Sequence, residues 1–217
     1  MLEKTEDGAL TVRSKEFGVT YHSTHGAIQE TQTVFIDAGL KYRAQQSNKI
    51  AVLGIGFGTG LNALMTYLHS LKEGLELEYI GVEAYPIDME VVKQLNYLDL
   101  LGAEPYEQDF IAMHSHSNKT IQLSPKFSFQ KKIAKFEDLN YKGQFDIIYY
   151  DAFAPNAQPH LWEPPMLHKM YNALKKDGVL VTYCAKGVFK RTLKSLGFSV
   201  EGLPGPIGKR EMTRAIK

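Results

Sequence analysis

The alternation of apolar and polar positions divides this chain into short apolar runs separated by segments with a helical period. Four runs are too short for helices and rich in β-branched or aromatic residues, so they predict buried strands at 50–53, 77–82, 145–150 and 179–184. Between them, apolar residues recur at every third or fourth position and predict helices at 62–72, 88–102, 164–174 and 188–196. Strands that alternate with helices are typical of an α/β fold with a mostly parallel sheet.

Two further pairs of short strands complete the predicted sheet. Residues 121–136 alternate loosely and predict two strands joined by a turn at Ser124-Pro125. Residues 198–203 and 211–216 flank the segment Pro204-Gly205-Pro206-Ile207-Gly208, which predicts an antiparallel hairpin at the C-terminus. We therefore expect a parallel sheet that finishes in antiparallel strands.

The N-terminal 48 residues are harder to interpret. Residues 1–14 are polar and predict an edge strand or a loosely held segment. Residues 17–21 alternate and predict a short strand, whereas residues 27–36 favour a helix that ends at Gly39. Because this segment precedes the first buried strand, we expect residues 1–48 to form a lid or substrate-binding segment on a domain that spans 49–217.

The stretch KIAVLGIGFGTG at 49–60 is the strongest local signal, because a buried strand ends in alternating glycines. A dinucleotide-binding fingerprint would need a third glycine where Thr59 or Leu61 stands, and a Walker loop would need a following Lys-Ser or Lys-Thr. The remaining G-x-G-x-G pattern resembles class I S-adenosylmethionine-dependent methyltransferases. The cofactor-binding residues expected here are Gly54, Gly56, Phe57, Gly58, Gly60 and Asn62.

Two acidic residues are candidates for further cofactor contacts. Glu83 ends the next strand, roughly 20 residues beyond the glycines, where a carboxylate can accept hydrogen bonds from both ribose hydroxyls; the alternative is a solvated charge at a strand end. Asp138 follows the predicted strands at 121–136. In methyltransferase architecture it would bind the adenine amino group, and the alternative is a cap for the following turn.

The stretch FDIIYYDAFAPNAQPHLW at 145–162 delivers a carboxylate to the carboxyl end of a central strand. A buried Asp151 would be costly without a partner, so we expect it to meet a ligand or a hydrogen-bond donor. Phe153 and Pro155 follow in a loop similar in position to the Asp/Asn-Pro-Pro-aromatic loop of methyltransferases that modify amines on bases. The aromatic residues near this loop have packing against the core as their alternative role.

Charge and composition limit the classes of partner and cofactor that the protein can bind. The net charge is +1, but residues 186–217 carry +6, so the remainder carries −5. This asymmetry indicates either a nucleic-acid-binding edge or a solvated basic tail. The single cysteine, Cys184, excludes an intramolecular disulfide and a Cys-rich metal site. Two histidine pairs, His22 with His25 and His114 with His116, have no acidic residue or cysteine that would complete a metal site. With no apolar run long enough for a membrane span and no leader, we expect a cytoplasmic protein without a metal.

A more specific resemblance rests on four motifs that span nearly the whole chain. Tyr21 followed by Gln29-Glu30-Thr31-x-x-Val-Phe, then GIGFGTGLN, YYDAFAPNAQPHLW and GKREM, resemble the methyltransferase portion of the bifunctional bacterial enzymes of the MnmC type. These enzymes complete 5-methylaminomethyl-2-thiouridine at the tRNA wobble position. The chain ends at Lys217, so we expect the stand-alone methyltransferase form, with no FAD and with a separate FAD-dependent oxidase or aminomethyl-forming complex acting upstream.

The resemblance implies methyl transfer from S-adenosylmethionine to the amine of 5-aminomethyl-2-thiouridine in tRNA. Asp151 would accept the amine proton, Tyr21 and Phe153 would wall the pocket, and Pro155 would shape the loop. The predicted phosphate contacts are Lys186, Lys190, Arg191, Lys209 and Arg210. Two alternatives stay open: an aminopropyltransferase of the spermidine synthase type, which acts on a small polyamine, and a non-catalytic nucleoside-binding module.

Overall fold

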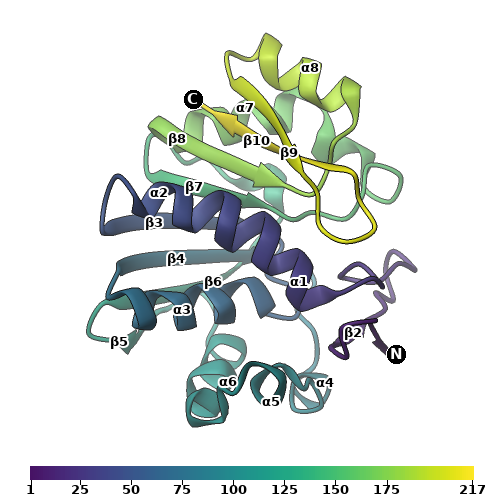
Figure 1. Ribbon diagram of the computed structural model, residues 1–217, viewed down its shortest axis with the longest axis vertical. Helices are drawn as coiled ribbons and strands as arrows, with labels where there is room; N and C mark the ends of the chain where they lie inside the picture. The colour runs from purple at the N-terminus through teal and green to yellow at the C-terminus, as the bar shows by residue number, and fades with distance from the viewer.

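A computed structural model describes residues 1–217, which form an eight-stranded sheet with helices against it (Figure 1). The strand order is β5-β6-β4-β3-β7-β8-β10-β9. Five central strands run parallel: β3 (Lys49–Ile55), β4 (Glu76–Glu83), β6 (Phe127–Ile133), β7 (Phe145–Tyr150) and β8 (Leu174–Thr182). β5 (Thr120–Ser124) and the hairpin of β9 (Ser199–Pro204) and β10 (Glu211–Ile216) are antiparallel. The predicted fold class is confirmed.

The parallel strands are buried on both faces because successive side chains point in opposite directions. On β7, Ile147 and Tyr149 belong to one core cluster, whereas Ile148 and Tyr150 belong to the other. The first cluster packs under the N-terminal helices and α3 (Leu61–Glu73), and the second under α7 (Pro164–Ala173) and α8 (Gly187–Ser195). None of the helices combines the length and the apolar character that a membrane span requires.

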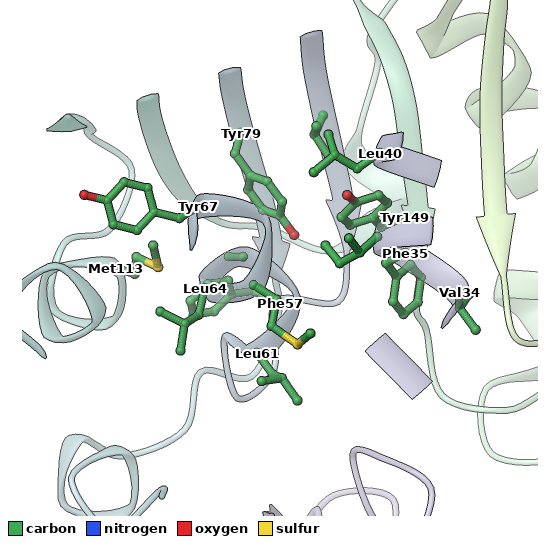
Figure 2. Packing of buried hydrophobic residues seen from close by; sticks show 14 of the residues in the cluster. Val34, Phe35, Leu40, Phe57, Leu61, Leu64, Tyr67, Tyr79, Met113 and Tyr149 are labelled. Atoms are coloured by element: carbon green, nitrogen blue, oxygen red, sulfur yellow. The ribbon is translucent and has the colours of Figure 1, made fainter. Parts of the chain in front are cut away.

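The N-terminal helix is longer than the sequence predicts. It comprises α1 (Ala27–Thr31), the π-helical segment η1 (Gln32–Lys41) and α2 (Tyr42–Ala44), and it passes through Gly39. A Cβ at Gly39 would lie 3.0 Å from Val181 and 3.2 Å from Tyr149, so this glycine lets the helix approach the sheet. Figure 2 shows Phe35 of this helix beside Tyr149, with ring centroids 5.1 Å apart. The predicted helix end at Gly39 is therefore wrong.

The segment before this helix contains a small separate hairpin, formed by β1 (Leu2–Lys4) and β2 (Leu10–Val12). The strand predicted at 17–21 is absent, apart from a single bridge between Arg13 and Thr20. Phe17 and Tyr21 instead contact the ring of Phe153, with centroid distances of 5.0 and 4.9 Å. Their alternation reflects a shared aromatic contact and not a strand register.

The connection between β4 and β5 also differs from the prediction. The single helix expected at 88–102 is divided into α4 (Met89–Val92) and α5 (Tyr97–Leu101), and α5 ends at Gly102 with φ of 60°. The sequence analysis assigned no element to η2 (Glu104–Tyr106) or α6 (Glu107–Ser115). In α6, Phe110, Met113 and His114 are buried, but too few apolar positions recur to reveal the helix in the sequence. Two short 3₁₀ turns, η3 (Phe136–Asp138) and η4 (Pro159–Trp162), complete the fold.

Candidate active site

A cavity of about 260 Å³ opens at the carboxyl ends of β3, β4 and β7. The chain leaves β3 toward β4 on one side, and β7 lies on the other, so this is the point of the sheet where strand order reverses. Ligands of open α/β sheets bind in this crevice, because neighbouring loops diverge there. The cavity is bordered by the glycine loop, the residues after β4, the loop after β7 and the N-terminal segment.

The glycine loop is shaped for close approach of its neighbours. Gly56, Gly58 and Gly60 have φ of +92°, +53° and +78°, which disfavour other residues. A Cβ at Gly58 would lie 2.7 Å from the Tyr21 ring, and one at Gly56 would lie 2.7 Å from the Asp151 carbonyl oxygen. Gly56, Phe57 and Gly58, which were predicted to bind the cofactor, line the cavity.

The other two glycines have structural roles. Gly54 lies within β3, where a Cβ would meet the Tyr79 hydroxyl at 2.7 Å. Gly60 begins α3 in a left-handed conformation, next to the His114 ring. Neither Gly54 nor Gly60 lines the cavity, although both were predicted to bind the cofactor.

Glu83 is buried at the end of β4 and faces the cavity. Its Oε2 accepts a hydrogen bond from the Gly58 backbone N–H at 2.7 Å, and its Oε1 accepts one from Tyr85 at 2.8 Å. Burial raises the pKa of this carboxyl group, while these backbone bonds and the nearby Lys131 act in the opposite direction. Each carboxylate oxygen keeps a second lone pair, so Glu83 can still accept hydrogen bonds from a diol.

Asp151 lies directly after β7, and its carboxylate is held on one side only. Its Oδ2 accepts a hydrogen bond from Asn62 Nδ2 at 2.7 Å, whereas its Oδ1 has no hydrogen-bond partner in the protein. Burial, followed by the negative charge of Glu30, raises the pKa of Asp151 well above its usual range; Asn62 and Lys209 oppose this shift. Asp151 therefore has a free oxygen and a high proton affinity, the two properties that a proton acceptor needs.

Asn62 connects Asp151 to the N-terminal helix. The Thr31 hydroxyl donates a hydrogen bond to Asn62 Oδ1 at 2.9 Å. Because this bond occupies the amide oxygen, the amide nitrogen is directed toward Asp151. Asn62 was predicted to bind the cofactor; it lines the cavity, and the structure also gives it the task of holding the carboxylate.

Aromatic rings enclose the cavity beside Asp151. Tyr21 and Phe153 lie in edge contact, and Phe17 bridges Phe153 and Tyr85, with a centroid distance of 5.7 Å to Tyr85. Burial, with a smaller contribution from Glu83, raises the pKa of the Tyr21 hydroxyl, which therefore stays protonated. The sequence analysis missed Phe17 and Tyr85. In the sequence, Phe17 is marked only by its place in the alternating run 17–21, and Tyr85 only by its position two residues after Glu83.

The loop that carries Phe153 is fixed by its own hydrogen bonds. The Phe153 backbone N–H donates to Gln158 Oε1 at 3.1 Å, and Trp162 Nε1 donates to the Phe153 carbonyl at 2.9 Å. The downstream tryptophan of the motif thus fixes the loop and does not reach the cavity. Pro155 lies in the same loop, half-buried and outside the cavity lining.

The residues after β6 contribute a different acid from the predicted one. Asp138 is exposed and does not line the cavity, whereas Lys135, Phe136 and Glu137 do. Glu137 Oε1 lies 2.9 Å from His160 Nε2 of the loop after β7. The structure therefore does not bring Asp138 to the site, because the 3₁₀ turn η3 directs its neighbour there.

The predicted phosphate-binding residues fall into two groups. Lys190 Nζ pairs with Glu211 at 2.8 Å, and Lys209 pairs with Glu30, so both cations are already partnered. Lys186 donates to Asn156 Oδ1 at 3.0 Å, while Arg191 and Arg210 are exposed and make no ion pair. Lys186, Arg191 and Arg210 are thus exposed and not paired with an acid, and Lys186 contacts the loop that follows Asp151. No group of three or more histidine, cysteine or acidic side chains is arranged to hold a metal.

Comparison with known proteins agrees with this geometry. A family model described as S-adenosyl-L-methionine-dependent methyltransferase matches residues 108–217, half of the chain. The chain is 29% identical over 216 residues to the tRNA 5-methylaminomethyl-2-thiouridine biosynthesis bifunctional protein MnmC of Leptospira interrogans, and 30% identical over 223 residues to that of Aromatoleum aromaticum. These matches cover 94% and 97% of this chain but 33% and 34% of the relatives, so the chain spans about a third of their length.

Two solved structures share the fold. MNMC2 from Aquifex aeolicus superposes with a TM-score of 0.77 at 24% identity, over 99% of this chain and 68% of that one. Spermidine synthase from Thermotoga maritima superposes with a TM-score of 0.58 at 18% identity, over 100% of this chain and 72% of that one. With the family model covering half of its residues, including the loop that carries Asp151, this chain belongs to the S-adenosyl-L-methionine-dependent methyltransferases.

Proposed function

We propose that this enzyme transfers a methyl group from S-adenosylmethionine to the amine of 5-aminomethyl-2-thiouridine at the tRNA wobble position, giving 5-methylaminomethyl-2-thiouridine. The observation that carries the proposal is the free Oδ1 of Asp151 inside a cavity walled by Tyr21 and Phe153. The MnmC relatives, named for the biosynthesis of this nucleoside in tRNA, match nearly all of this chain.

The chemistry explains why a proton acceptor is needed. An aliphatic amine with a pKa near that of lysine, about 10.4, is mostly protonated at neutral pH and has no free lone pair. S-adenosylmethionine, when bound, supplies an electrophilic methyl group whose sulfonium becomes a neutral thioether as the new N–C bond forms. Asp151 Oδ1 takes one proton from the ammonium group beforehand and later releases it to solvent, while the aromatic wall orients the amine and excludes water.

The cofactor is held by the glycine loop and by acids on two strands. Gly56 and Gly58 let the loop pack against Asp151 and Tyr21, where a Cβ would collide, and Glu83 offers two acceptor oxygens for the ribose hydroxyls. We assign the adenine contact to the turn Phe136–Asp138, with Glu137 in the cavity in place of Asp138. These residues suit a nucleoside that carries no pyrophosphate, since no lysine or arginine lies on the glycine loop.

Residues 1–48 act as the substrate side of the site. Phe17 and Tyr21 come from this segment and close the cavity against the loop that carries Phe153. The first helix of the segment supplies Thr31, which orients Asn62 toward Asp151. The N-terminal segment therefore completes the site for the amine, whereas the glycine loop, Glu83 and the turn Phe136–Asp138 bind the cofactor.

The tRNA contacts lie along α8 and the β9–β10 hairpin. Lys186, Arg191 and Arg210 are exposed cations on this edge. Val188 and Ile207 on the same edge are 68% and 62% exposed, which is typical of a surface that packs against a partner. Lys186 reaches Asn156 of the loop after Asp151, so the edge begins next to the cavity. Phosphates bound here would leave the wobble base near Asp151.

The reaction also indicates where this enzyme acts. Its substrate is a tRNA that already carries a primary aminomethyl group, which a separate FAD-dependent oxidase or another aminomethyl-forming complex would supply. We expect the enzyme to work in the cytoplasm, where tRNA is modified.

The deciding experiment is mass spectrometry of nucleosides from tRNA that carries 5-aminomethyl-2-thiouridine, after incubation with the enzyme and methyl-labelled S-adenosylmethionine. We expect one labelled methyl group on that nucleoside and none on the same tRNA without the aminomethyl group. Unlabelled tRNA together with transfer from decarboxylated S-adenosylmethionine to a polyamine would replace the proposal by an aminopropyltransferase.

A further inference from the structure

A partly buried ion pair lies next to the hydrogen bonds that hold the reactive carboxylate. Glu30 of α1 is 7% exposed, and its Oε1 accepts a hydrogen bond from Lys209 Nζ. Its Oε2 accepts a second hydrogen bond from the Ser23 backbone N–H at 3.1 Å. Lys209 also lies over the Tyr183 ring, 4.1 Å from the centroid. Neither charge contacts the cavity lining directly, and neither is used by the chemistry proposed above.

The pair joins segments from the two ends of the chain. Lys209 belongs to the tip of the β9–β10 hairpin, and the tip docks on the first helix through the Ile207 backbone N–H, which donates to Gln29 Oε1 at 3.0 Å. A Cβ at Gly208 would lie 2.4 Å from the His25 ring, so the glycine permits this close approach. Lys209 is thus placed beside Glu30 by the fold and is not a mobile surface cation.

Glu30 of α1 directly precedes Thr31, which holds Asn62 against the Asp151 carboxylate. Lys209 of the hairpin tip lies over Tyr183, whose hydroxyl donates to the carbonyl of Ala152, next to Asp151. The phenols of Tyr79 on β4 and Tyr183 after β8 are the other titratable groups near this carboxylate. Burial raises the pKa of both phenols, so they stay neutral. Glu30 and Lys209 thus place one negative and one positive charge near Asp151, and these charges act on its carboxyl group in opposite directions.

We propose that Glu30 and Lys209 are positioning residues that together control when Asp151 holds a proton, a role that rests on the amine methylation proposed above. Glu30 makes Asp151 a better proton acceptor for the incoming ammonium group. Lys209 limits this effect, so that Asp151 is still ionised when the amine arrives. Removal of either charge alone should disturb the balance, and removal of both should restore it.

The test is to titrate Asp151 directly, by the ¹³Cγ NMR signal of aspartate-labelled protein assigned with Asp151→Asn. Glu30→Gln should lower the Asp151 midpoint, and Lys209→Met should raise it, each by about 0.5–1 pH unit. Glu30→Gln/Lys209→Met should return close to wild type. Lys209→Arg keeps the charge and should change the midpoint little, which guards against a Lys209→Met variant that fails to fold.

The matched control is the exposed pair Asp37 and Lys41 on the same helix, with Nζ and Oδ1 at 2.7 Å. Asp37→Asn and Lys41→Met should leave the midpoint unchanged. Equal shifts in the same direction for Glu30→Gln and Lys209→Met, or no shift, would overturn the inference. The titration uses no substrate, so its outcome is independent of whether tRNA is the methyl acceptor. In the methylation assay, the low-pH limb of the rate against pH should move in the same directions as the Asp151 midpoint.

Discussion

Two carboxylates stand at the ends of parallel strands on the same edge of the sheet, but their surroundings differ. Glu83 after β4 accepts backbone hydrogen bonds on both oxygens, at 2.7 and 2.8 Å. Asp151 after β7 accepts one bond from Asn62, and its other oxygen is free. The two donors to Glu83 are backbone N–H groups, of Gly58 in the glycine loop and of Tyr85 after β4, whereas Asn62 is itself held through a side chain of another helix.

This difference separates binding from chemistry. A carboxylate with a donor on each oxygen is fixed in orientation and suits the recognition of a ligand that keeps its protons. Burial raises the pKa of both carboxyl groups, but only Asp151 has an oxygen free to exchange a proton. The same functional group at equivalent places in the sheet thus has two roles, and variants of the two regions should affect different steps.

The largest effect is expected for Asp151→Asn. Asparagine keeps the shape but cannot take a proton, so kcat should fall by about 10²–10⁴-fold. The dissociation constant of S-adenosylmethionine, measured by calorimetry, should stay within a few fold. Asp138→Asn is the matched control, an exposed aspartate outside the cavity, and should leave both quantities unchanged. Retained turnover in Asp151→Asn would refute the proton-acceptor role.

The same variant has a consequence for stability. Because the pKa of Asp151 is raised in the folded state, the native protein binds more protons than the unfolded chain between the normal aspartate pKa and the raised value. Ionised Asp151 therefore destabilises the fold at high pH, and this cost is relieved as the pH falls through the raised pKa. Asp151→Asn should have the higher Tm at pH 8, and its advantage should shrink as the pH is lowered.

The next largest effect is expected for Glu83→Gln. The glutamine amide has one acceptor oxygen and cannot accept from both Gly58 and Tyr85, so one backbone N–H loses its partner. The dissociation constant for S-adenosylmethionine should rise by about 10–100-fold, while kcat at saturating cofactor changes by only a few fold. Glu78→Gln on the exposed side of β4 is the control. Unchanged calorimetric affinity in Glu83→Gln would contradict the ribose assignment.

A smaller effect on turnover is expected for Thr31→Val. The variant keeps the side-chain volume but loses the donor that orients the Asn62 amide, so the amide can turn its oxygen toward Asp151. A hydrogen bond of about 1 kcal/mol corresponds to a fall in kcat of roughly 5- to 10-fold. The low-pH limb of the rate profile should move upward, because Asn62 then ceases to favour ionised Asp151.

Thr33→Val, two residues along on the same helix, removes a hydroxyl that accepts a hydrogen bond from Gln29 and should not change the rate profile. A Thr31→Val enzyme with normal kcat and an unmoved low-pH limb would show that Thr31 only supports packing.

The smallest effect on Glu83 and Asp151 is expected for substitutions of the exposed cations of α8 and the β9–β10 hairpin. Arg191→Gln with Arg210→Gln should leave S-adenosylmethionine binding and the Asp151 titration unchanged. The affinity for tRNA should fall and depend less steeply on salt, because each lost phosphate contact lowers the slope of log K against log[salt] by about 1. A binding curve that keeps its wild-type salt dependence would place the tRNA contacts elsewhere on the surface.

Much of the cofactor half could be predicted from the sequence because it is encoded locally. The β3 strand, the glycine loop, α3 and Glu83 lie within 35 consecutive residues, from 49 to 83. The apolar runs and the glycines of the turn predict these elements directly. The C-terminal hairpin was equally predictable, since the Pro-Gly segment marks its turn. Asp151 was found for the same reason, as the first polar residue after a run of buried β-formers.

The rest of the site depends on contacts between distant segments. Phe17 meets Phe153 and Tyr85 only after three loops converge, and the apolar pattern of residues 17–21 alone resembled a strand. The extension of the first helix through Gly39 follows from its packing on Tyr149 and Val181. Local propensity cannot predict either result, because the surface that stabilises it is supplied by another part of the chain.

Hydrophobic periodicity and glycines at defined spacings were sufficient to predict the α/β fold, the glycine loop and the two strand-end carboxylates. What each carboxylate can do depends on neighbours that come from distant parts of the chain. Asn62 is 89 residues from Asp151, and Lys209 is 179 residues from Glu30. Their hydrogen bonds and charges act on the site because the packing of helices on the sheet brings them within a few ångströms, and that packing is a property of the whole chain.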